Sequence, residues 1–224
     1  MKRNIVIATV AALTLVGGGT ATALAVTGDD ESGAANRSSV QLKDHDRDDD
    51  RKDDDRDDAA ENTAEAKAAK VTAADAVKAA LADTKGTAVS AELDDEDGGL
   101  VWDVDILNGK TWHSVEVDPG TGKVLGSWTE KDDDGDDAAD AARLNSALKG
   151  ASVTAADAAR AGADKGTVTS VDLDDDGRAT AWSVETTDSK GAESEYNVDL
   201  KTDKVTADHQ GDHDDRDDND GSDD

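Results

Sequence analysis

Hydrophobic and polar residues follow the same order twice along this chain. Each copy begins with a segment of helical periodicity, VTAADAVKAAL at 71–81 and VTAADAARAGA at 153–163. Segments of alternating polarity follow, such as LVWDVDI at 100–106, where leucine, tryptophan, valine and isoleucine share one parity. A period near 3.6 predicts an amphipathic helix, and a period of two predicts a strand with one buried face. Each copy therefore predicts a helix followed by strands.

Local signals indicate where these elements begin and turn. Thr72 and its counterpart in the second copy are suited to cap the helices, because an aspartate three residues later completes a capping box in its aspartate form. Val77 and Leu81 are predicted to lie on one helical face. Asn108-Gly109 predicts a hairpin turn between two strands. The predicted module is α+β, with one helix packed on a three-stranded antiparallel sheet.

The correspondence between the copies extends over about 55 residues, which indicates a duplicated small domain. The offset is 82 residues at the helical segments, 80 at Trp102 and Trp182, and 81 at Val117 and Val198. Single-residue gaps in loops account for these differences. Because Trp102 and Trp182 occupy equivalent positions in predicted strands, we expect both in the core.

Acidic segments surround the two copies. The segment 43–58 is dominated by aspartate, so it has nothing from which to form a core. Alanine-rich segments at 59–70 and 138–149 are candidate lead-in helices. The predicted organisation is a signal peptide at 1–25, a disordered acidic spacer at 26–58, a first module with its lead-in at 59–128, an acidic linker at 129–140, a second module with its lead-in at 141–207 and a disordered acidic tail at 208–224.

The N-terminus has the pattern of an export signal. A lysine and an arginine precede an apolar run from Ile5 to Val16, and Ala23-Leu24-Ala25 forms an A-x-A cleavage site. The mature protein would begin near Val26 and be secreted or held in the cell envelope. An uncleaved membrane anchor is the alternative. No second apolar stretch follows, so we expect no membrane span in the mature chain.

Charge and cysteine content narrow the range of partners. The formal net charge is −30, and the chain has no cysteine, which excludes disulfides and lipid attachment through cysteine. A chain this acidic repels nucleic acid and anionic lipid. It favours basic proteins and divalent cations, and we expect the acidic tails to bind such cations weakly and without selectivity.

The sequence offers no catalytic constellation. Three of its four histidines, His45, His209 and His213, lie in the acidic segments, and His113 lies in a predicted strand with no nucleophile nearby in sequence. Paired carboxylates occur in runs, whereas acid–base catalysis needs two carboxylates in distinct, fixed environments. We therefore expect no enzyme activity and no cofactor.

Asp172, Asp174 and Asp176 are weak candidates for a metal site. With Gly177 they match the first half of an EF-hand loop, but Ser183 stands where a bidentate glutamate is needed. The segment also coincides with a predicted strand and turn, so a solvated β-turn is the simpler interpretation.

Trp112 and Trp128 are candidate partner-binding residues. Trp112 has the opposite parity to Val115 and Val117, and Trp128 follows the last predicted strand. An exposed tryptophan on a highly charged domain is typical of an interaction site. Packing of each ring against a neighbouring helical segment is an equal alternative.

The first copy resembles the PepSY domain. The similarity rests on VTAADA at 71–76 and on VDPGTGKVL at 117–125. The second copy departs from it where Leu200 and Asp203 replace proline and glycine, so its last turn is open to a different geometry. PepSY domains occur in propeptides of thermolysin-type metallopeptidases and in small exported bacterial proteins.

The resemblance implies a non-catalytic binding module. The metallopeptidase motif HExxH is absent, so any peptidase that the module restrains or inhibits would be a separate extracellular protein. The alternative function is that of an acidic cation-binding or cation-sensing envelope protein in which the aspartate-rich segments are the active parts.

Overall fold

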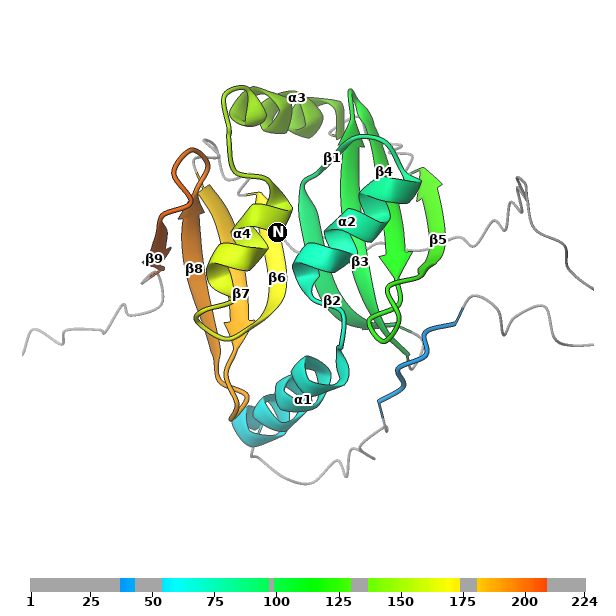
Figure 1. The fold of residues 1–224 in the computed structure, drawn as a ribbon, viewed down its shortest axis with the longest axis vertical. Coiled ribbons are helices and arrows are strands. Elements are labelled where there is room, and N and C mark those ends of the chain that lie inside the picture. The colour runs from blue at the N-terminus through cyan, green and yellow to red at the C-terminus, as the bar shows by residue number, and fades with distance from the viewer. Residues whose placement is uncertain (1–36, 43–53, 97–98, 130–136, 174–180, 209–224) are drawn as a thin grey trace, which may run out of the picture.

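The computed structural model describes residues 37–42, 54–96, 99–129, 137–173 and 181–208 (Figure 1). The predicted signal peptide and most of the acidic spacer, linker and tail lie outside these segments. The first half contains α1 (Asp54–Ala68), α2 (Ala73–Asp83), β1 (Thr87–Ala88), β2 (Ser90–Glu96), β3 (Gly99–Asn108), β4 (Thr111–Val117) and β5 (Val124–Thr129). The second half contains α3 (Asp137–Leu148), α4 (Ala155–Gly162), β6 (Thr167–Leu173), β7 (Ala181–Thr187), β8 (Glu193–Asp199) and β9 (Val205–Ala207).

The strands form one antiparallel sheet in an α+β fold. Its order is β5-β4-β3-β2-β6-β7-β8-β9, and β1 pairs with β3 off this path. The sequence predicts three strands in each copy, but a further short strand, β5 or β9, follows the last predicted turn in each half. None of the described helices is long and apolar enough to cross a membrane.

The two halves join through their inner strands rather than being separate modules on a tether. Antiparallel pairing of β2 with β6 places Ala91 opposite Val171, which is its own counterpart in the other half. On either side, Ser90 lies opposite Asp172 and Glu92 lies opposite Ser170. We call this pairing of β2 with β6 the seam. Its register gives it a local two-fold symmetry, as in the interface of a symmetric dimer.

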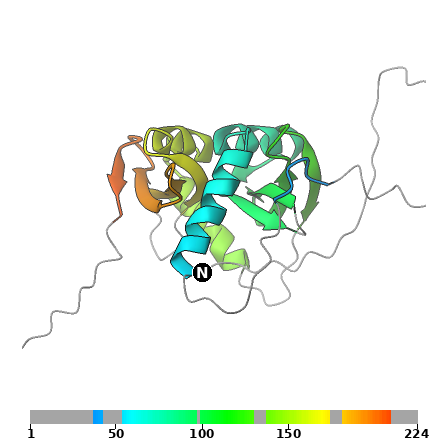
Figure 2. The same ribbon diagram turned by 90° about the horizontal axis from the view of Figure 1, so that it is seen from below.

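The core lies between the sheet and two helices. Figure 2 shows α2 and α4 side by side on one face of the sheet. Trp102 and Trp182 are fully buried beneath them, as predicted, and each indole Nε1–H donates a 3.0 Å hydrogen bond to the carbonyl of Val71 or Val153. Gly162 permits close packing of α4, because a Cβ there would lie 2.6 Å from Val184 Cγ1.

The predicted helix starts are present. Thr72 and Thr154 are the N-caps of α2 and α4, and each side chain accepts a hydrogen bond from the backbone N–H of the aspartate three residues later. The reciprocal bond that completes the capping box is present at Thr154. Val77 and Leu81 lie one turn apart in α2, as predicted, but only Val77 is buried, since Leu81 is 36% exposed near the end of the helix.

The two lead-in helices pack at different places. Helix α3 lies on the side of the sheet opposite α2 and α4 (Figure 2), where Ala141 and Leu144 are buried. Helix α1 lies at the lower end of the molecule in Figure 1, beside the β7–β8 turn. Gly191 in that turn has a φ of +87°, and a Cβ there would lie 1.8 Å from the carbonyl oxygen of Ala59.

The predicted spacer at 26–58 is not structureless throughout. Helix α1 begins at Asp54, and Val40 and Leu42 pack against the core of the first half. The remaining parts of the predicted disordered segments, 26–36, 43–53, 130–136 and 209–224, lie outside the described residues.

Candidate partner-binding surfaces

The outer edges of the sheet are β5 and β9, because the seam occupies the inner edges of both halves. Among the described residues, β5 pairs only with β4, and β9 pairs only with β8. A strand with one neighbour presents a row of backbone donors and acceptors on its free side. Strand β5 has six residues and β9 has three, so β5 offers the longer edge.

Trp128 lies on this longer edge. It is half-buried, opposite Ser114 of β4, on the face of the sheet that α2 does not cover. Its ring packs over Gly126, where a Cβ would lie 2.8 Å from Trp128 Cζ3. Its indole Nε1–H has no hydrogen-bond partner among the described residues. Trp128 therefore places a half-buried aromatic ring at an open strand edge, while its indole N–H is buried without a partner in the described part of the chain.

Trp112, the other candidate, lies in the core. It is 4% exposed on β4 opposite Leu107, on the face that α3 covers. The alternative that the sequence left open, packing against a neighbouring helical segment, describes this environment. Trp112 is therefore too deeply buried to serve as an exposed partner-binding residue.

Asp172 lies at the seam between the halves, in β6. Its Oδ1 accepts a 2.6 Å hydrogen bond from the hydroxyl of Ser90, and its Oδ2 accepts one from Ser170. Asp174 and Asp176, its predicted partners in a metal site, lie outside the described residues. Within the segments that the structure describes, no group of three or more His, Cys, Asp or Glu side chains is arranged to hold a metal ion.

The described histidine, His113, makes a local contact. Its Nδ1 lies 3.2 Å from the hydroxyl of Thr129 on the neighbouring strand β5. His45, His209 and His213 lie outside the described residues. The geometry around His113 shows a hydrogen bond between neighbouring strands.

Two aspartates anchor equivalent turns at the ends of β4 and β8. Partial burial raises the pKa of Asp118, but hydrogen bonds from Ser39, Gly120 and Thr121 outweigh it, so the pKa lies below its ordinary value. The pKa of Asp199 is lowered by hydrogen bonds from the hydroxyl of Thr202 and from nearby backbone N–H groups. Both groups are therefore ionised at neutral pH.

The last turn of the second half keeps the geometry of the first. The backbone N–H of Gly122 donates to the carbonyl of Asp118 at 2.8 Å, and that of Asp203 donates to Asp199 at 3.2 Å. Gly122 has a φ of 74°, and Asp203 adopts the same left-handed region with a φ of 52°. Aspartate tolerates this conformation better than most residues, so the exchange of glycine for aspartate leaves the turn intact.

Glu65 of α1 lies in an acidic surrounding at the lower end of the molecule. Burial raises its pKa to about 7, and the negative charges of Glu61, Asp95, Asp94 and Glu193 add to this effect. Sequence reasoning missed this group, because its acidic neighbours come from three separate segments of the chain. A carboxyl that exchanges its proton near neutral pH makes the docking of α1 sensitive to pH.

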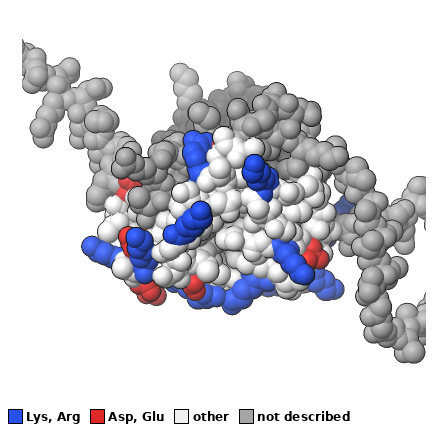
Figure 3. Space-filling view, turned by 90° about the horizontal axis from the view of Figure 1, so that it is seen from above, with Lys and Arg blue, Asp and Glu red and all other residues white. Residues whose placement is uncertain are grey.

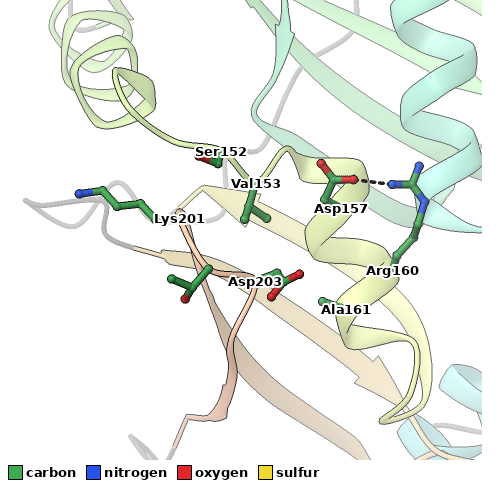
Figure 4. Close-up of a pocket in the computed structure, with 8 residues that line it drawn as sticks. Ser152, Val153, Asp157, Arg160, Ala161, Lys201 and Asp203 are labelled. Carbon is green, nitrogen blue, oxygen red and sulfur yellow. Dashed lines mark hydrogen bonds and ion pairs between the residues drawn. The ribbon is translucent and has the colours of Figure 1, made fainter.

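An open hollow of about 520 Å³ lies between α4 and the β8–β9 turn (Figure 4). Arg160 is engaged by Asp157 at 2.6 Å, and Lys201 points away from this pair. The charged groups do not converge on a common point, so the hollow does not have the form of a catalytic site. Its lining residues are Ser152, Val153, Asp157, Arg160, Ala161, Lys201, Thr202 and Asp203.

Charge is unevenly distributed over the surface. Figure 3 views the end of the molecule formed by α3 and by the β3–β4 and β8–β9 turns, and shows more basic than acidic side chains there. These elements contribute Lys110, Arg143, Lys149, Lys201 and Lys204. The net charge of −30 is thus concentrated elsewhere in the chain.

Comparison with known proteins identifies one domain. Residues 70–128 match the family model of the PepSY domain, described as the peptidase propeptide and YPEB domain. The solved structure of a candidate lipoprotein from Clostridium difficile 630 is similar at 25% identity, covering 61% of this chain and 91% of that chain, with a TM-score of 0.40. No curated protein matches the chain.

Proposed function

We propose that this chain is an exported, non-enzymatic binding protein that restrains a separate extracellular protein, and that a peptidase is the first partner to test. The observation that carries this proposal is the match of residues 70–128 to a domain of peptidase propeptides. A binding module of this kind would restrain its partner by occupying part of the partner's surface. The basic partner surfaces that a charge of −30 attracts are compatible with this role.

The proposed contact is strand addition at β5. An extended segment of the partner would pair with the free side of β5, because main-chain hydrogen bonds supply affinity in such complexes. Trp128 would supply the side-chain contact through the exposed part of its ring, because it is half-buried on β5 and tryptophan is enriched among residues that dominate binding energy. The seam leaves β2 and β6 unable to take this role.

The test is inhibition and capture of peptidases secreted by the source organism. The wild-type chain should retain a peptidase and lower its activity, and Trp128→Ala should weaken binding by about 2 kcal/mol, or roughly thirtyfold. Leu81→Ala is the control, because Leu81 is an exposed apolar side chain on α2, on the opposite face of the sheet from Trp128. Equal binding by wild type and Trp128→Ala would contradict the proposed contact.

The second candidate function is cation binding by the acidic segments, and the specific observation in its favour is the excess of 54 acidic over 24 basic residues. Calorimetric titration with Ca²⁺ of the full chain and of residues 37–208 separates the two proposals. A cation-binding function predicts that heat of binding disappears with the trimmed segments. A partner-binding function predicts that peptidase capture survives the same trimming.

A further inference from the structure

A short segment ahead of α1 lies against the first half of the molecule. We call residues 37–42, Arg37-Ser38-Ser39-Val40-Gln41-Leu42, the strap. Its exposure alternates, with Ser38, Val40 and Leu42 half-buried and the residues between them exposed. This period of two is that of a strand laid against a surface. The side chains of Ser38, Val40 and Leu42 therefore face the protein.

The strap completes the edge of β3 where β4 ends. Strand β4 stops at Val117, opposite Trp102, so the buried Leu100 has no β4 residue beside it. The backbone N–H of Leu100 donates to the carbonyl of Val40 at 2.9 Å, and the hydroxyl of Ser38 donates to the carbonyl of Leu100. These two bonds satisfy backbone groups that would be costly to bury unpaired.

The carboxylate of Asp118 holds the strap from the other side. Its Oδ1 accepts bonds from the N–H groups of Gly120 and Thr121, both at 2.8 Å, within its own turn. Its Oδ2 accepts the N–H of Ser39 at 2.7 Å, and its Oδ1 also accepts the hydroxyl of Ser39 at 2.8 Å. One side chain thus recognises both the backbone and the hydroxyl of the same strap residue.

Gly120 shapes the surface that the strap touches. A Cβ at this position would lie 2.5 Å from the hydroxyl of Ser39 and 3.0 Å from Val40 Cγ2. Both distances are shorter than normal contact, so a side chain here would displace the strap. Leu100, Asp118 and Gly120 together define what we call the strap groove.

The second half shows that the turn does not need a strap. Asp199 accepts the N–H groups of Lys201 at 3.0 Å and Thr202 at 2.9 Å, as Asp118 does with its own turn. Among the described residues, all donors to the Asp199 carboxylate belong to that turn. Lys201 stands where the first half has Gly120. The contacts of Asp118 with Ser39 are therefore an addition specific to the first half.

We propose that the strap groove is a peptide-recognition site and that the strap is its built-in occupant. The site accepts an extended peptide with two serines followed by an aliphatic residue, a spacer and a second aliphatic residue, the pattern of Ser38 to Leu42. A segment of this kind from a partner protein exchanges with the strap. The proposal concerns a different surface from the free edge of β5 and does not depend on it.

The strap competes with any such peptide because it is part of the same chain. Tethering gives a flexible segment an effective concentration in the millimolar range, which weakens the apparent affinity of a free competitor. Releasing the strap without altering the groove should therefore reveal the site. Ser39→Ala combined with Val40→Asp does this, since both residues belong to the strap alone.

The test measures binding of a fluorescent peptide, NRSSVQLK, which is residues 36–43 of this chain, by fluorescence polarisation. The full-length variant with Ser39→Ala and Val40→Asp, which we call the released chain, should bind this peptide at least about tenfold more tightly than wild type. Adding Gly120→Ala to the released chain should remove this gain, because the new Cβ occupies the place of the peptide serine. The control peptide NRAAVQLK should bind at least about tenfold more weakly, because it lacks both hydroxyls.

A second measurement uses the wild-type chain and does not depend on any variant folding. Millimolar unlabelled NRSSVQLK should displace the strap and so shift the backbone amide resonances of the chain's own Ser39 and Val40, and NRAAVQLK should not. A folded released chain that binds the peptide no better than wild type would overturn the proposal. If the released chain does not fold, absence of the shifts at Ser39 and Val40 overturns it instead.

Discussion

Two buried tryptophans link helix and sheet through the same hydrogen bond in both halves. Trp102→Phe and Trp182→Phe should each lower the free energy of unfolding by about 1–3 kcal/mol, because the carbonyl of Val71 or Val153 loses its donor in a buried place. Urea unfolding measures both changes. Trp128→Phe is the matched control, since its N–H has no partner to lose among the described residues. Equal losses at all three positions would show that ring size, and not the hydrogen bond, sets the cost.

Parity along the strands predicted the burial of Trp102 and Trp182 but could not decide the environment of Trp112. A residue on the second face of a sheet is buried only where another element covers that face. The segment 138–149 was recognised as helical, but its sequence does not say which surface it covers. In the structure, α3 packs on β4 and buries Ala141 and Leu144 beside the sheet, so Trp112 joins the core.

At the scale of elements, α1 is held against a surface that carries its own charge sign. The pKa of Glu65 is raised from 4.5 to about 7, so the folded state holds a proton that the unfolded state has lost over this interval. The contribution of Glu65 to the docking of α1 is therefore least unfavourable below pH 4.5 and worsens as pH rises to 7. Protection factors of α1 amides from hydrogen exchange should fall over this range.

Glu65→Gln isolates this effect, because it keeps the shape of the side chain and removes its titration. The protection factors of α1 in this variant should change much less between pH 4.5 and 7 than those of wild type. The same pH dependence in both proteins would show that it does not come from Glu65.

The helices and strands were the most predictable elements, and the strap was the least. Capping threonines and alternating strands are local signals, and the structure contains α2, α4 and the strands where those signals lie. The strap consists of serines and single aliphatic residues, which carry little burial signal of their own. Its place is determined by Asp118 and Leu100, which are far away in sequence. No local pattern could have joined these residues.

At the scale of the whole molecule, the seam between β2 and β6 converts two similar halves into one sheet. The sequence repeats the strand but does not indicate its partner, since alternating alanine, valine and leucine would suit many neighbours. The register that places Ala91 opposite Val171 also brings α2 and α4 together on the same face. Helix contact and strand pairing thus couple the same two halves, so we expect wild type to unfold in one cooperative transition.

Ala91→Pro should separate this transition into two. Proline removes a backbone donor from the middle of the seam, where Ala91 is fully buried, and such a change costs about 3 kcal/mol or more. The half that contains β2 should unfold at lower temperature, and the other half should follow at a temperature of its own. Calorimetry measures the number of transitions, and Glu92→Ala, exposed on the same strand, is the control that should retain one. A single transition in Ala91→Pro, shifted but not divided, would mean that the packing of α2 against α4 suffices to couple the halves, and that the seam aligns them without holding them together.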